Sequence, residues 1–112
     1  MIEVILVVQA YQLCVMSLDF SVKYDCFPVT RGKQSTPTPL GVFPIQSITP
    51  TSDYLSPWVI QFHKQQENMF AVHSWDKTIP IGEFSNGCIR LNPEDLDNLI
   101  NNYLFSTVLI KP

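Results

Sequence analysis

Apolar and polar residues alternate along much of the chain, in short runs separated by turn-forming residues. Between Gln12 and Ser17 the alternation has the two-residue period of a half-buried strand. Residues 18–21 form a plausible turn, and residues 22–29 are expected to return as the next strand. A reversal centred near Phe20 would bring Cys14 and Cys26 nearly opposite each other, in a cross-strand contact or a disulfide. Further strands are expected over 42–48, 58–62, 69–72 and 107–110.

One later segment has instead the three-to-four-residue period of an amphipathic helix. Asn92 suits an N-cap and Pro93 the first helical position, and the acids that follow lie where the positive end of a helix dipole favours them. An apolar stripe comes next and predicts an end near Asn102 or Tyr103; it consists of Leu96, Leu99, Ile100 and Tyr103. Residues 31–41 and 49–57 are expected to be proline-shaped loops. The expected fold class is mostly β, with one short α-helix near the C-terminus packed against the sheet.

Composition narrows the class of protein. A chain of 112 residues suits one domain, covering 1–112, and 46% hydrophobic against 15% charged residues is typical of a core-forming globular chain. The net charge of −3 and the lack of a long Lys/Arg cluster argue against nucleic-acid binding. The longest early apolar stretch, Val4 to Val8, is far below the roughly 18 residues of a membrane span. Glu3 stands where a secretory signal would be basic, so no export signal is expected.

The three cysteines cannot all pair with one another, so at least one thiol is expected to be free. Their spacing matches neither a disulfide framework nor a zinc site, and no metal or organic cofactor is expected. Cys88 has small or polar neighbours at 85–87, which allow a tight turn with N–H groups beside the sulfur, as an oxyanion hole requires. Arg90 would bind an anionic substrate and help to hold the thiolate below its usual pKa of about 8.5. The alternative is that Cys88 is a small buried hydrophobic residue.

His73 strengthens the catalytic interpretation, because it ends a strand 15 residues before the thiol. A neutral imidazole there would take the thiol proton and later deliver it to a leaving amine. The alternative is a structural histidine that bonds a backbone carbonyl, and we assign this structural role to His63.

These residues resemble a known family. His73 followed by the run Ser85–Leu91 is similar to the signature of the L,D-transpeptidases, the YkuD-type catalytic domain. Segments 27–33, 36–43 and 56–62 resemble that family's central strand, its loop and the strand before its histidine. The resemblance runs in order from about Leu13 to Leu91.

The resemblance implies a β-sandwich of mixed sheets that acts on the peptide stems of peptidoglycan. Cys88 would attack the carbonyl of the stem's diamino acid, expelling D-alanine and leaving a thioester, with His73 as general base and acid. Ser74 would orient the imidazole through its main-chain carbonyl. The N–H groups of Gly87 and Cys88 would hold the oxyanion, and Arg90 would position the cleft or a substrate carboxylate. Carbapenems would inhibit, and the cell envelope or periplasm is the implied location.

The remaining candidate residues are Ser85, Asn86 and Trp75, which would line the oxyanion and substrate site. Asn86 stands where the family often has a second histidine, and Asn cannot titrate near neutrality. Trp75 is either a packing aromatic or a wall for the substrate stem. The region 47–56 is too brief for a large lid. Two other functions stay open: an L,D-carboxypeptidase that uses water as acceptor, and a wall-binding β-domain with an inert cysteine.

Overall fold

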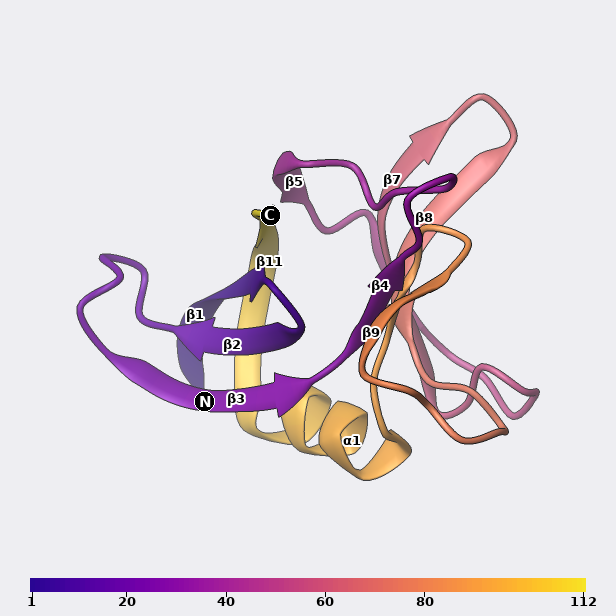
Figure 1. Ribbon diagram of the computed structural model, residues 1–112. Helices are drawn as coiled ribbons and strands as arrows, with labels where there is room; N and C mark the ends of the chain where they lie inside the picture. The colour runs from indigo at the N-terminus through magenta and orange to yellow at the C-terminus, as the bar shows by residue number, and fades with distance from the viewer.

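Two mixed β-sheets enclose a single hydrophobic core in the computed structural model, which describes residues 1–112. Figure 1 shows the sheets as separate layers, with the single helix at one end of the space between them. The core draws buried side chains from both sheets and from the helix, among them Leu6, Val15, Phe62, Val72, Ile89 and Leu99. The expected fold class is thereby confirmed.

The first sheet has five strands, and its centre pairs the two ends of the chain. In spatial order the strands are β3 (Lys23–Pro28), β2 (Gln12–Met16), β1 (Ile2–Gln9), β11 (Tyr103–Ile110) and β5 (Gly41–Pro44). β1 and β11 run parallel and the other pairs antiparallel, as the indigo and yellow strands of Figure 1 show. β2 and β3 place Cys14 opposite Cys26, and the two form a disulfide.

The second sheet carries the candidate site. Its six strands, in spatial order, are β6 (Ser47–Pro50), β7 (Trp58–Gln65), β8 (Asn68–His73), β10 (Ile89–Arg90), β4 (Thr30–Gly32) and β9 (Gly82–Ser85). The pairs β8–β10 and β4–β9 are parallel, and the others are antiparallel. The parallel β8–β10 pair brings together two segments that lie 15 residues apart in sequence.

Helix α1 (Pro93–Asn102) begins and ends where its sequence pattern predicts. Leu96 and Leu99 are fully buried in the core, which is worth about 1.5–3 kcal/mol for each side chain. Asn92 occupies the N-cap position, but its side chain makes no capping hydrogen bond. Burial of the apolar stripe therefore fixes this helix more than its cap does. No helix in the structure has the length and apolar character needed to cross a membrane.

The prediction of one strand over 42–48 is wrong, because the chain changes sheets inside that range. The Ile45 N–H donates to the Ser106 carbonyl on β11, whereas the Gln46 N–H donates to the Gln61 carbonyl on β7. Pro44 has no N–H to continue the first ladder. The segment is therefore split into β5 in one sheet and β6 in the other.

Several predicted boundaries also need correction. The loop expected from 31 begins at 33, because Arg31 and Gly32 belong to β4, and the loop expected from 49 begins after Pro50. β7 continues to Gln65 and β11 starts at Tyr103, so both strands are longer than predicted. The sequence predicts no strand at β1, β4, β9 or β10.

Candidate functional site

Strand pairing places Cys88 and His73 on the same face of the second sheet. In the parallel β8–β10 pair, Val72 lies beside Ile89, and His73 lies beside Arg90. Val72 and Ile89 are fully buried in the core, so the alternating neighbours Cys88, Arg90 and His73 face the opposite side of the sheet. The spacing of strands and residues separates the Cα atoms of His73 and Cys88 by about 8 Å. This is the distance of a diagonal pair on neighbouring strands.

The hydrogen bond of His73 determines which of its nitrogens is available as a base. Nδ1 lies 2.5 Å from the main-chain oxygen of Ser74. A carbonyl only accepts, so Nδ1 carries the proton and Nε2 keeps its lone pair in the neutral ring. Burial lowers the pKa of His73, and the Arg90 charge lowers it further, against the opposing effects of the Ser74 carbonyl and Asp53. The imidazole is therefore neutral at pH 7.

Cys88 is half-buried and is the one free thiol of the chain. Its Sγ lies 3.7 Å from the main-chain oxygen of Met69 on β8, to which the thiol donates. Burial raises the pKa of Cys88 above its ordinary value, although the Ala71 N–H and Arg90 act to lower it. Arg90 acts in the expected direction on the pKa of Cys88, but desolvation outweighs it, so the net shift is upward and not downward. The resting site pairs a neutral thiol with a neutral imidazole.

Ser85 fixes the turn before Cys88. This side chain is buried; its Oγ accepts the Gly87 N–H at 3.1 Å and donates to the Cys88 carbonyl at 2.5 Å. Since the Gly87 N–H already has a partner, its predicted oxyanion role requires that N–H to be shared or released. That role stays a prediction, as does the role of the Cys88 N–H.

Two threonines that the sequence analysis left inside a loop hold this turn from behind. The buried Thr38 hydroxyl donates to the Gly87 carbonyl at 2.7 Å and accepts the Gly32 N–H at 2.9 Å. Thr36 donates to the Ser85 carbonyl at 3.1 Å. The sequence feature that could have identified these threonines is the alternation of threonine and proline over 36–39, because prolines restrict the backbone and so fix the orientation of the hydroxyl groups.

The β6–β7 loop and Trp75 cover the histidine. The Ser74 N–H donates to the Leu55 carbonyl at 3.3 Å. The Tyr54 ring meets the Trp75 ring edge-on at 5.2 Å between centroids, and the Arg90 guanidinium carbon lies 4.3 Å from the Trp75 ring centroid. The 47–56 region is brief, yet Tyr54 from the loop after β6 reaches the site. Sequence alone gave no sign of that contact.

The other candidate side chains lie apart from this cover. Asn86 is exposed on the turn before Cys88. The Ser74 hydroxyl is buried without a hydrogen-bond partner, so only the main chain of Ser74 contacts the imidazole. His63 lies between the rings of Phe43 and Phe70, at 5.0 and 5.8 Å between centroids, which is the position of a packing residue.

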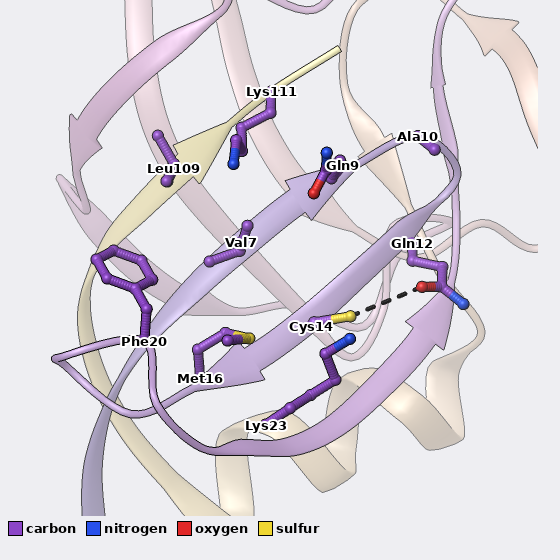
Figure 2. Close-up of a pocket in the computed structure, with 10 residues that line it drawn as sticks. All are labelled: Val7, Gln9, Ala10, Gln12, Cys14, Met16, Phe20, Lys23, Leu109 and Lys111. Carbon is purple, nitrogen blue, oxygen red and sulfur yellow. Dashed lines mark hydrogen bonds between the residues drawn. The ribbon is translucent and has the colours of Figure 1, made fainter.

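Two surface hollows lie away from Cys88 and His73. One, of about 620 Å³, lies over the outer face of β1, β2 and β11, and Figure 2 shows its lining, which includes Val7, Met16, Phe20, Lys23 and Leu109. The other, of about 650 Å³, is lined by more polar residues, among them Tyr11, Arg31, Lys33 and Glu83. Neither of these two hollows is lined by Cys88 or His73. The site is identified by its chemistry and not by its volume.

Comparison with known proteins agrees with the family resemblance seen in the sequence. The family model of the L,D-transpeptidase catalytic domain (YkuD) matches residues 4–110. Among curated proteins, none matches this sequence significantly.

Solved structures of L,D-transpeptidases share the fold. An enzyme from Mycobacterium smegmatis superposes with a TM-score of 0.71 at 21% identity, over 98% of this chain and 59% of its own. L,D-transpeptidase 3 from Mycobacterium tuberculosis, in complex with a faropenem-derived adduct, superposes with a TM-score of 0.77 at 20% identity, over 98% of this chain and 60% of its own. The L,D-transpeptidase LdtMt1 in complex with imipenem superposes with a TM-score of 0.69 at 18% identity, over 97% of this chain and 59% of its own. This chain spans about half to three fifths of the length of these solved relatives.

Proposed function

This chain belongs to the L,D-transpeptidase catalytic-domain family, and on that premise we propose that it is a cysteine acyltransferase acting on peptidoglycan tetrapeptide stems. The observation that carries the proposal is the shared face of β8 and β10, where Cys88, His73 and Arg90 lie together. His73 Nε2 has a free lone pair because Nδ1 is held by the Ser74 carbonyl. A thiol protonated at neutral pH needs such a base.

In the first half-reaction, Sγ of Cys88 attacks the carbonyl carbon of the diamino acid. The thiol proton passes to His73 Nε2 as the new S–C bond forms. The C–N bond to D-alanine then breaks, and the same proton passes to the leaving amine. The Cys88 N–H stabilises the oxyanion, joined by the Gly87 N–H if Ser85 Oγ releases it.

In the second half-reaction an acceptor resolves the thioester. The amine of a neighbouring stem attacks the thioester carbonyl, loses a proton to His73 and forms the cross-link, while Cys88 leaves and is reprotonated. With water as acceptor the product is the free tripeptide, and the enzyme is an L,D-carboxypeptidase.

Intact-mass spectrometry after treatment with imipenem or faropenem tests whether the thiol is an acyl acceptor. These compounds are chosen because two of the structural relatives were solved with them. Cys14 and Cys26 are joined to each other, so a stoichiometric adduct under non-reducing conditions is expected on Cys88 alone. The adduct should vanish in Cys88→Ala. An unmodified wild-type mass would contradict the proposal and support a non-catalytic wall-binding domain.

The acceptor is tested with a disaccharide tetrapeptide and mass analysis of the products. A cross-linked dimer supports transpeptidation. Tripeptide as the sole product would refute transpeptidation and establish the carboxypeptidase. Cys88→Ala serves as the control for contaminating hydrolases.

We also propose a location in the cell envelope, where the substrate lies and where a disulfide persists. The Cys14–Cys26 bond supports this, since disulfides are rare in reducing compartments. Alkylation of free thiols in intact cells before lysis should label one cysteine of this chain. Labelling of all three would contradict the proposed location.

A further inference from the structure

The side chain of Arg90 is held by an aromatic face. Its guanidinium carbon lies 4.3 Å from the centroid of the Trp75 ring, within the range of a cation–π contact. Its Nε is buried and has no hydrogen-bond partner. The contact with the indole therefore holds the Arg90 guanidinium in place, since no hydrogen bond at Nε does so.

The indole is itself fixed from two sides. Tyr54 meets it edge-on, with interplanar angle 90° and centroids 5.2 Å apart. The centroid of the His73 ring lies 6.4 Å from the centroid of the indole. Trp75 follows His73 by two residues and is half-buried, so it is anchored next to the proposed base.

Arg90 occupies a central position on the reactive face. It lies opposite His73 in the β8–β10 register and two residues beyond Cys88, so its Cα is about 7 Å from that of the cysteine on the same face. Its charge acts on both reactive groups and lowers the pKa of each. A displaced guanidinium would change the ionisation of the thiol and the attraction of anions to it.

We propose that Trp75 is a positioning residue, whose indole face holds the Arg90 guanidinium beside Cys88 so that the site attracts anionic acyl donors. The inference rests on the proposed function for its biological meaning, because the donor stem carries carboxylates. Its physical content is the positive potential at Sγ, which can be measured without any substrate. The alternative role of Trp75, a passive packing wall, makes no contribution to that potential.

The test compares the alkylation rates of Cys88 by iodoacetate, which is anionic, and by iodoacetamide, which is neutral and of similar shape. Under non-reducing conditions Cys88 is the one thiol that reacts. The ratio of the two rates reports the local potential and cancels changes in exposure and nucleophilicity. At a separation of charge and sulfur equal to the Cα spacing, about 7 Å, a unit charge raises this ratio roughly threefold even at the dielectric constant of water.

Four variants separate the roles. Arg90→Gln removes the charge and should lower the ratio about threefold or more, and Trp75→Leu should lower it to nearly the same value. Trp75→Phe keeps an aromatic face and should retain most of the wild-type ratio. Tyr24→Leu, an exposed aromatic on the other sheet, is the matched control and should leave the ratio unchanged.

The pH profile of iodoacetamide alkylation supplies a second readout. Loss of the nearby cation should shift the apparent thiol pKa upward in Trp75→Leu, as in Arg90→Gln. The other charged or titratable groups around the site are His73 on β8 and Asp53 from the β6–β7 loop, and all four variants keep them.

Two outcomes would overturn the inference. A wild-type ratio in Trp75→Leu, with a lowered ratio in Arg90→Gln, would show that the indole does not place the charge. A wild-type ratio in Arg90→Gln would show that the charge does not act at the thiol. If Trp75→Leu does not fold, the rate ratios of Trp75→Phe and Arg90→Gln are compared instead. Equal ratios in these two variants would refute the role of the aromatic face. Failure of imipenem acylation in the wild type would refute the proposed function and leave these alkylation results intact.

Discussion

Replacement of Gly87 by alanine probes the turn before the nucleophile. Gly87 has a φ of +119°, which L-residues rarely adopt, and an added Cβ would lie 2.6 Å from Cε1 and 3.1 Å from Cδ1 of Phe70. The backbone strain should cost about 1–3 kcal/mol. The overpacking against a half-buried ring should cost a further 1–3 kcal/mol or so. The expected loss of about 2–6 kcal/mol is a large share of the 5–15 kcal/mol or so that stabilises a domain.

A matched glycine isolates the steric part. Gly41 has a φ of +137°, but an added Cβ would meet nothing closer than 3.6 Å. Gly41→Ala should therefore show the backbone cost alone, about 1–3 kcal/mol. Urea unfolding, followed by the fluorescence of Trp58 and Trp75, gives both losses.

A double-mutant cycle with Phe70→Leu then tests the cause. Trimming the ring should recover about 1 kcal/mol or more of the Gly87→Ala loss, and it should leave the Gly41→Ala loss unchanged. The rate of imipenem acylation should fall at least about tenfold in Gly87→Ala, since small displacements of reacting groups are costly. Equal stability losses at the two glycines, together with no coupling to Phe70, would refute this reasoning.

Four further predictions follow from the site and the first sheet. Burial lowers the pKa of His73, so the acidic limb of an acylation–pH profile should have its midpoint below about 6.5. His73→Ala should slow acylation roughly 10²–10⁴-fold. A wild-type rate in that variant would show that His73 has only a structural role. Ser74→Ala removes an unpartnered buried hydroxyl, so activity and stability should hold within about 0.5 kcal/mol. Thr38→Val orphans two buried main-chain groups and should cost about 1–3 kcal/mol in urea unfolding. Replacing Cys14 and Cys26 together by alanine opens a loop with a sequence separation of 12 and should cost about 3 kcal/mol; an unchanged urea midpoint would contradict this.

The sequence was most informative where a single local pattern decides the structure. The stripe at Leu96 and Leu99 predicted α1 almost to the residue, because only a helix brings these positions to one face. The alternation near Gln12 and the turn near Phe20 predicted the pairing of Cys14 with Cys26.

The prediction failed where tertiary pairing decides. β9 and β10 are four and two residues long, too short for any period to show, and they exist because β4 and β8 offer them ladders. The burial of β1 alternates, but its apolar run hides this in the sequence, because Ile5 and Val7 on the outer face are apolar too. Residues 42–48 read as one strand because the pattern stays apolar across Pro44, and the sheet that each half joins depends on partners distant in sequence.

The same division holds for the candidate site. Cys88 and His73 could be selected from chemistry and spacing, and the Ser74 carbonyl from the resemblance. The pKa of Cys88 could not be predicted correctly, since it depends on burial that the sequence does not display. Tyr54 and Thr38 reach the site from distant loops, and no spacing rule connects them to the nucleophile.

The parallel pairing of β1 with β11 sets an order on biosynthesis. β1 has β11 as its parallel neighbour, and the Ala10 N–H donates to the carbonyl of Pro112. During synthesis, β1 and β2 therefore leave the ribosome with their apolar faces uncovered and stay so until β11 has been made. The first sheet, and with it the core that supports Cys88, is completed only after translation has passed the cysteine by about two dozen residues.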